Sequence, residues 1–158
     1  MRKMTFQDEH DFEGYIRGLI ATHITSTDKN IYALTNKKAV DIVICKDNEP
    51  TDLYFIEVKY HKHRHGRLGF GGSKGTGYQP EILDRRPKFF QKNMRWVIGQ
   101  EDNDKIYFLT NDDLINYIAG GQIGEKFNNI QKRVFQDEQG LTEDEFVSEL
   151  TKWLKKER

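Results

Sequence analysis

The first clear pattern along the chain is helical and lies near the N-terminus. Between residues 6 and 21, apolar side chains recur every three or four positions, the spacing of one face of an α-helix. Gly14 and Gly18 lower the helix propensity of this segment, but the periodicity still predicts a helix over residues 6–21. The apolar positions are Phe12, Tyr15, Ile16, Leu19 and Ile20.

A second helical pattern occurs at the other end of the chain. Thr142 and Glu145 have the spacing of a capping box, in which each residue satisfies a backbone N–H at the start of a helix. A face of apolar residues follows at helical spacing, formed by Phe146, Val147, Leu150, Trp153 and Leu154. A shorter helix is predicted to run to residue 117, with Asn111 or Asp112 as its cap.

The middle of the chain is predicted to supply the strands. Five segments rich in β-branched and aromatic residues fit strands: residues 31–34, 40–45, 53–60, 95–98 and 105–110. Residues 79–93 are predicted to form a helix, in which Pro80 suits the start and Pro87 should cause a break or kink. The order of elements indicates an α/β fold with a mixed central β-sheet flanked by helices. We expect a single domain over residues 1–158.

The composition is that of a folded protein with a polar surface. The 158 residues include 32% charged and 12% aromatic residues, and the mean hydropathy is −0.80. The apolar residues occur in structured runs, which disordered chains lack. No apolar stretch reaches the length of a membrane span, and the N-terminus lacks the apolar core of a signal peptide. Cys45 is the single cysteine, so a cytoplasmic location is expected.

Charge is balanced over the whole chain but not along it. Lys plus Arg and Asp plus Glu each number 25, so the net charge indicates no partner. Residues 59–80 contain no acidic residue, however, and carry several lysines, arginines and histidines. A neutral protein with one locally basic segment can still present a phosphate-binding face.

The charged residues of the strand at 53–60 indicate chemistry. Strand alternation places Glu57 and Lys59 on one face, about 7 Å apart, and strand pairing can bring Asp41 of the preceding strand beside Glu57. Mg²⁺ prefers hard oxygen ligands and keeps several waters, so two converging carboxylates suffice to bind it. A bound metal can polarise a phosphate and help to ionise water. The alternative is an exposed cross-strand ion pair, but the large apolar neighbours indicate a central strand, where charges are costly unless they function.

These residues resemble a known family. Val-Asp41-Ile-Val-Ile and Ile-Glu57-Val-Lys59, with 15 residues between Asp41 and Glu57, resemble the core motif of the PD-(D/E)xK nuclease superfamily, which includes most type II restriction endonucleases. The resemblance extends from the first helix to about residue 98 and implies a restriction-endonuclease-like core. Val40 stands at the proline position of the motif, and that proline is often missing in the superfamily.

The resemblance also implies roles for individual residues. Asp41 and Glu57 would be the metal ligands, with the backbone carbonyl of Val58 as a third. Lys59 would lie near the attacking water, where it lowers the pKa of that water or stabilises charge on the phosphate. The first helix of such enzymes often adds an acidic residue to the metal site. Glu13 is the candidate here, with Glu9 one turn earlier as the alternative.

The basic segment after Lys59 is expected to contact DNA. Residues 66–77 are rich in glycine and lack the Gly-Lys-Ser/Thr ending of a nucleotide-binding loop, so we expect a loop that wraps DNA. His61, His63 and His65 alternate as zinc ligands can, but no nearby cysteine or acid completes such a site. The candidate DNA-binding residues are Lys62, Arg64, His65, Arg67, Lys74 and Gln79.

The function expected from the sequence is a DNA endonuclease that uses Mg²⁺, with Mn²⁺ as a substitute. A sequence-specific type II restriction endonuclease acting on double-stranded DNA as a homodimer is the leading hypothesis, since one site cuts one strand. A structure-selective nuclease, such as a Holliday junction resolvase, or a homing-type nuclease is the alternative within the same chemistry. A non-catalytic DNA-binding or antirestriction-like module, with Glu57 and Lys59 as a structural pair, is the alternative outside it.

Overall fold

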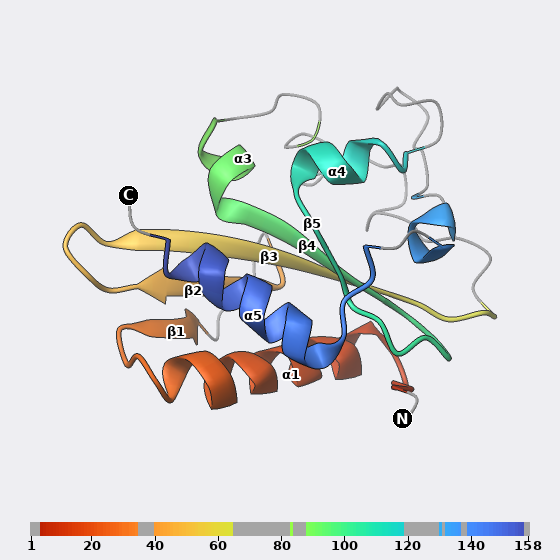
Figure 1. The fold of residues 1–158 in the computed structure, drawn as a ribbon, viewed down its shortest axis with the longest axis horizontal. Helices are drawn as coiled ribbons and strands as arrows, with labels where there is room; N and C mark the ends of the chain where they lie inside the picture. The colour runs from red at the N-terminus through yellow and green to blue at the C-terminus, as the bar shows by residue number, and fades with distance from the viewer. Residues whose placement is uncertain are drawn as a thin grey trace.

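A five-stranded mixed sheet forms the centre of the computed structural model (Figure 1). The structure describes residues 4–34, 40–64, 83, 88–118, 130, 132–136 and 139–156. The strands are β1 (Ile31–Leu34), β2 (Ile42–Lys46), β3 (Asp52–His61), β4 (Met94–Gln100) and β5 (Tyr107–Leu109), and they lie in that order across the sheet. β3 and β4 are parallel, and the other neighbours are antiparallel. The α/β class and the mixed sheet predicted from the sequence are therefore confirmed.

Helices lie on both faces of this sheet. The helices are α1 (Glu9–Ile20), α3 (Lys88–Asn93), α4 (Asn111–Ile115) and α5 (Glu143–Leu154), together with a π-helical turn (Ala21–Thr25) and a 3-10 turn (Lys132–Gln136). α1 and α5 share one apolar cluster with the sheet, and α4 belongs to a second cluster on the opposite face. In Figure 1, α5 crosses in front of the strands, while α3 and α4 lie above them. None of these helices is both long enough and apolar enough to span a membrane, as far as the described residues extend.

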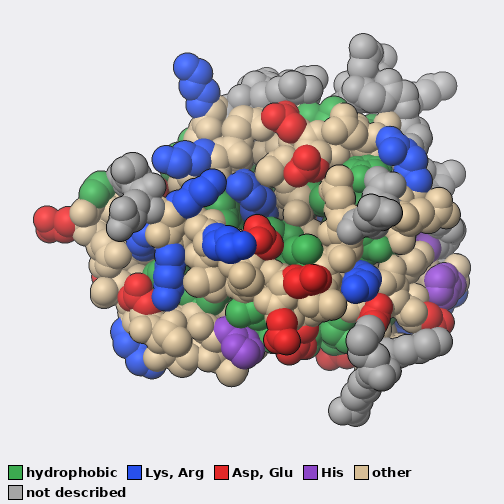
Figure 2. Space-filling model, in the orientation of Figure 1, with side chains coloured by type: hydrophobic (Ala, Val, Ile, Leu, Met, Phe, Trp, Pro, Cys, Tyr) green, Lys and Arg blue, Asp and Glu red, His purple; other side chains and the backbone are tan. Residues whose placement is uncertain are grey.

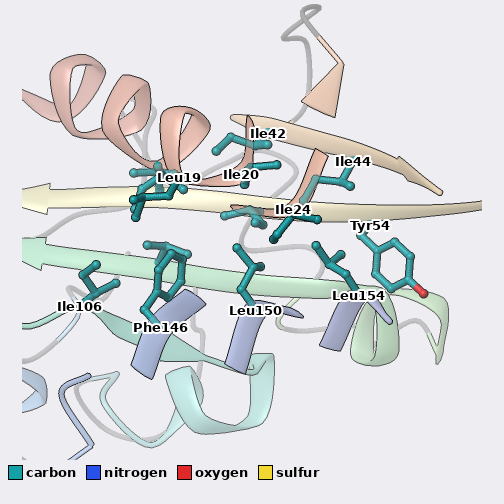
Figure 3. Close-up of a cluster of buried hydrophobic side chains, with 14 of the residues drawn as sticks. Leu19, Ile20, Ile24, Ile42, Ile44, Tyr54, Ile106, Phe146, Leu150 and Leu154 are labelled. Atoms are coloured by element: carbon teal, nitrogen blue, oxygen red, sulfur yellow. The ribbon is translucent and has the colours of Figure 1, made fainter. Parts of the chain in front are cut away.

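The larger apolar cluster joins the two ends of the chain. Figure 3 shows side chains of α1, the π-helical turn and β2 meeting those of α5, among them Ile20, Ile24, Ile42, Phe146 and Leu150. Each of these five side chains is fully buried. Burying one large apolar side chain contributes about 1.5–3 kcal/mol, so this cluster fixes α1 and α5 against the sheet.

The cluster on the opposite face is organised around the indole of Trp96. Trp96 is fully buried, and its Nε1 donates a hydrogen bond of 2.7 Å to Oδ1 of Asn111 at the start of α4. The Asn111 side chain in turn donates to the carbonyl of Phe90 in α3. Tyr107 is buried on the same face, and its hydroxyl donates to the carbonyl of Phe135. One amide side chain thus ties β4, α4 and α3 together.

The ends of the first helix differ from the prediction. α1 begins at Glu9 rather than at residue 6, because Asp8 acts as the N-cap and its carboxylate accepts the N–H of Asp11 at 2.9 Å. At the other end the helical path does not stop at residue 21 but continues as the π-helical turn to Thr25. The apolar periodicity located the buried face correctly but not the residues that end the helix.

The helix starts near the C-terminus were predicted with mixed success. The prediction that Asn111 or Asp112 caps α4 is wrong. Thr110 is the N-cap, and it forms a capping box with Asp113. Asn111 is instead the first residue of the helix, because its side chain is used by Trp96. The capping box predicted from Thr142 at the start of α5 is confirmed.

The strands and the central helix agree with the prediction within the described residues. β2 begins at Ile42, two residues later than predicted, and β5 covers only Tyr107–Leu109 of the predicted residues 105–110. Of the helix predicted over residues 79–93, the structure describes Leu83, which is helical, and α3, which begins directly after Pro87 in the sequence. The predicted glycine-rich loop at 66–77 lies outside the described residues.

Candidate active site

The candidate site lies where β3 extends beyond its partner β2. The pairing of β2 with β3 ends at Ile42 and Ile56, whereas β3 continues beside β4 as far as His61. Along this part of β3, two carboxylates take the place of a neighbouring strand. Asp41 Oδ2 accepts the N–H of Val58 at 2.8 Å, and Glu9 Oε2 accepts the N–H of Tyr60 at 3.4 Å. Because β2 ends here, this edge of β3 is free to accept acidic groups from two parts of the chain, Asp41 before β2 and Glu9 of α1.

Glu57 and Lys59 point from this part of β3 toward the face that holds Trp96. Their register partners on β4 are the fully buried Trp96 and Ile98. Lys59 Nζ lies 3.0 Å from Glu57 Oε1, and both side chains are at most 5% exposed. The predicted shared face of Glu57 and Lys59 is confirmed. A buried ion pair of this kind loses much of its Coulomb gain to desolvation and is weak evidence for a stabilising role.

The pKa of Glu57 is raised, so its charged form is unfavourable in the folded protein. Burial raises the pKa most, the positive charge of Lys59 lowers it, and the charge and hydrogen bonding of Asp41 raise it; together they give a pKa of about 8. A carboxyl with such a pKa holds its proton at neutral pH unless another cation offsets the charge. A buried carboxyl with a raised pKa beside a second carboxylate is typical of functional sites.

Helix α1 adds its own charges to the same cluster. Glu13 is buried and forms an ion pair with Arg17, with Oε1 and Nε 2.9 Å apart. The guanidinium of Arg17 also donates to the backbone carbonyl of Asp41 at 2.7 Å. Burial raises the pKa of Glu9, where the charge of Lys59 opposes the shift and those of Asp41 and Glu13 add to it. Both candidate acids of the first helix are thus electrostatically joined to the site.

Arg17, which makes two of these contacts, was not predicted from the sequence as a site residue. Arg17 links α1 to Asp41, a predicted ligand that directly precedes β2, and so fixes the helix against this end of the strand. Its spacing of four residues from Glu13 is a signal of an ion pair on a helix. That spacing does not reveal the contact with Asp41, which depends on how α1 packs against the sheet.

The donor atoms present suit Mg²⁺ better than a transition metal. Within the described ranges, no three His, Cys, Asp or Glu side chains form a group that could hold a metal on their own. Mg²⁺ does not need such a group, because it commonly binds one or two carboxylates and keeps several waters. The charge of Asp41 acts on Glu57 and raises its pKa, and the Val58 carbonyl points to the same edge as the Val58 N–H that Asp41 accepts. Two carboxylates and one carbonyl therefore fit this cation.

The histidines after the site lie in different surroundings. His61 is buried, its ring stacks at 6.0 Å on that of Phe135, and its Nδ1 lies 3.4 Å from the side-chain nitrogen of Gln100. His63 is exposed, and its Nε2 lies 3.7 Å from Oδ2 of Asp102. His65 lies outside the described residues, so the three-histidine alternative is placed only in part.

The predicted DNA-binding residues are also described only in part. Lys62 Nζ donates to the backbone carbonyl of Gln7 at 2.6 Å, and Arg64 is exposed just after β3. The backbone N–H of His63 and the positive charges of Lys62 and Arg64 lower the pKa of Glu101, a partly exposed acid on the turn after β4. Four further candidates lie outside the described residues: His65, Arg67, Lys74 and Gln79.

An exposed ion pair elsewhere shows by contrast what is unusual about the site. Figure 2 shows the face that α5 crosses, where acidic and basic side chains are interspersed. On α5, Lys152 Nζ lies 2.7 Å from Glu149 Oε1, and the two side chains are 68% and 47% exposed. Glu57 and Lys59 are the same two residue types but are almost fully buried. The interpretation of Glu57 and Lys59 as a solvent-exposed strand pair is therefore wrong.

The site thus combines two interacting carboxylates, a buried lysine and two further acids from α1, all at one edge of β3. Comparison of the chain with family models, with curated proteins and with solved structures gave no match.

Proposed function

We propose that this chain is a Mg²⁺-dependent endonuclease that hydrolyses phosphodiester bonds in DNA. The observation that carries the proposal is the convergence of Asp41, Glu57 and Lys59 at the point where β2 stops pairing with β3. The order of helix, three strands, helix and strand around these residues supports a PD-(D/E)xK core of the restriction-endonuclease-like kind. The parallel pairing of β3 with β4 places Glu57 and Lys59 beside the buried Trp96 and Ile98.

Each residue has a part in the proposed chemistry. Asp41, Glu57 and the carbonyl of Val58 would hold Mg²⁺, which polarises the phosphate, helps to ionise a water and offsets charge on the leaving oxygen. Lys59 holds a positive charge beside these carboxylates, where it can orient the attacking water and stabilise the charge that develops on the phosphate. Arg17 positions Asp41 by donating to the backbone carbonyl of Asp41, and it pairs with Glu13 beside the site.

Burial of the ion pair favours catalysis over the non-catalytic alternative. A DNA-binding module needs basic residues at its surface to meet phosphates. Lys59 is almost fully buried and bonded to Glu57, so in the non-catalytic alternative it would belong to a structural pair and would not be one of those surface contacts. Burying two charged groups costs free energy. A bound cation in place of the proton on Glu57 would offset the charge of its carboxylate, which is a functional reason for burying it.

A plasmid-cleavage experiment tests the proposal. Supercoiled plasmid is incubated with Mg²⁺ or Mn²⁺ and the wild-type protein, and with the variants Asp41→Asn, Glu57→Gln and Lys59→Met. The wild type should nick or linearise the plasmid, and each variant should lose about 100-fold or more in rate. Discrete bands would indicate sequence specificity, and cleavage of synthetic junctions alone would indicate structure selectivity.

The exposed pair on α5 provides matched controls. Glu149→Gln and Lys152→Met change the same residue types at positions where both side chains are exposed, and they should cleave like the wild type. If the wild type leaves plasmids and junctions intact at every Mg²⁺ and Mn²⁺ concentration, the chain is not a nuclease. If the site variants cleave like the controls, the assignment of Asp41, Glu57 and Lys59 is wrong.

A further inference from the structure

Three aromatic rings lie next to the candidate site on the same face of the sheet. Phe55 precedes Glu57 by two residues on β3, so their side chains share a face about 7 Å apart along the strand. The ring of Phe55 lies 5.9 Å from that of Phe89 and 5.2 Å from that of Phe90, both on α3. Phe89 and Phe90 are themselves 5.5 Å apart. We name Phe55, Phe89 and Phe90 the aromatic platform.

The aromatic platform is open to solvent at Phe89. The side chain of Phe89 is 48% exposed, and Phe55 and Phe90 are half-buried. A single exposed phenylalanine is ordinary on a protein surface. Here, however, the exposed ring rests on two others, in the edge-to-face contacts that aromatic pairs prefer.

The short helix that carries this ring is held from three sides. Asn93 Nδ2 donates to the carbonyl of Leu53 on β3 at 2.9 Å. Asn111 Nδ2 donates to the carbonyl of Phe90, and Trp153 Nε1 of α5 donates to the carbonyl of Lys92, each at 3.1 Å. Bonds from β3, α4 and α5 therefore fix α3 and orient Phe89 before any ligand arrives, which reduces the entropic cost of binding.

The charges beside the platform favour a nucleic acid as its partner. Lys88 and Lys92 are exposed on α3, and the helix contains no acidic residue. Lys92 is three residues after Phe89, so the two side chains are neighbours on the helix surface. In a symmetric contact between two copies of this chain, these lysines would come close to their own counterparts and repel them. A base, in contrast, offers a flat apolar ring together with a phosphate that the lysines attract.

We propose that the aromatic platform stacks an unpaired base of the DNA substrate, a few nucleotides from the phosphate that is cut. This inference rests on the proposed nuclease function and adds a substrate class to it. A base inside a duplex must first be extruded, which costs a few kcal/mol. Substrates with a single-stranded segment beside the cleavage position are therefore preferred over continuous duplex.

Binding can be measured separately from cleavage. A short single-stranded oligonucleotide containing the fluorescent base 2-aminopurine is titrated with the full chain, with Ca²⁺ in place of Mg²⁺. Stacking should quench the fluorescence in the wild type. Loss of stacking in Phe89→Ala should weaken the affinity at least about fivefold. Phe89→Tyr keeps an aromatic face and should stay within about twofold of the wild type.

Leu53→Ala is the matched control for the loss of exposed apolar surface. Leu53 is 38% exposed and lies on β3, the strand of Phe55, but it has no aromatic face, so its truncation should leave affinity and quenching unchanged. Equal affinities for the wild type and Phe89→Ala would overturn the proposal. An equal loss in Leu53→Ala and Phe89→Ala would overturn it too, because the contact would then be merely apolar. A dimer that dissociates in Phe89→Ala without a loss of DNA affinity would assign the platform to contact between copies instead.

The cleavage assay keeps this inference apart from the function on which it rests. If the wild type cuts DNA and Phe89→Ala cuts single-strand-containing and duplex substrates in the wild-type ratio, the platform assignment fails and the nuclease assignment stands. If no substrate is cut but Phe89→Ala still loses binding, the nuclease assignment fails while the binding platform remains.

Discussion

Glutamine at position 57 would keep the shape of the side chain without its charge, so Glu57→Gln isolates the cost of the buried carboxylate. Burial, with the charge of Lys59 opposing it and that of Asp41 adding to it, raises the pKa of Glu57 from 4.5 to about 8. The folded protein then binds this proton more tightly than the unfolded chain does. The stability linked to this proton is complete below the unfolded pKa and is lost as the pH rises through the folded pKa. Between pH 5 and pH 8 the wild type should therefore lose about 3 kcal/mol of unfolding free energy through this group.

Urea unfolding at pH 5 and pH 8 without divalent cations measures this loss. The difference in stability between Glu57→Gln and the wild type should shift by about 3 kcal/mol in favour of the variant on going to pH 8. Glu149→Gln removes an exposed acid and should follow the wild type. Saturating Mg²⁺ at pH 8 should stabilise the wild type but not Glu57→Gln, because a ligand stabilises only the form that binds it. If Glu57→Gln loses stability with pH as steeply as the wild type, the assignment of a buried, strained carboxyl is refuted.

Three further predictions concern the fold that holds the site. In Gly99→Ala the new Cβ would lie 2.8 Å from Cζ of the buried Phe12 ring, so urea unfolding should show a loss of about 1–3 kcal/mol; an unchanged midpoint would mean that the ring has room to move. Phe146→Ala empties a fully buried position between α5 and the sheet and should cost about 3–5 kcal/mol by the same measurement, whereas a loss below about 1 kcal/mol would contradict the packing of α5. Thr142→Ala removes the side chain that accepts the N–H of Glu145 and should lower stability by about 1 kcal/mol, with Thr142→Ser as the control that retains the hydroxyl.

The candidate pair on β3 was predictable because strand alternation is a strictly local rule. Once residues 53–60 are assigned to a strand, Glu57 and Lys59 must share a face. The apolar neighbours also indicated correctly that this strand is central. The direct interaction of Asp41 with Glu57 is a weaker deduction, because it needs the register of β2 against β3. That register depends on the turn between them as well as on the apolar pattern.

Contacts between residues far apart along the chain could not be predicted from the sequence. Arg17 and Glu9 reach Asp41 and the Tyr60 N–H because α1 lies along the edge of β3 that β2 leaves open. Helical periodicity identifies the apolar face of α1 but not the strand edge against which its polar residues fall. The N-cap of α4 was predicted wrongly for a related reason. Thr110 and Asn111 are both suitable cap residues, but the side chain of Asn111 accepts a hydrogen bond from the distant Trp96, and Thr110 is the cap.

The rate of plasmid nicking as a function of Mg²⁺ concentration tests the central claim most directly, when wild type, Glu57→Gln and Glu149→Gln are compared side by side. If Asp41, Glu57 and Lys59 form one Mg²⁺-dependent site, the rate rises to a plateau in the wild type and in Glu149→Gln, and it is at least about 100-fold lower in Glu57→Gln. Equal rates in Glu57→Gln and the wild type, or no nicking by the wild type at any Mg²⁺ concentration, would contradict it.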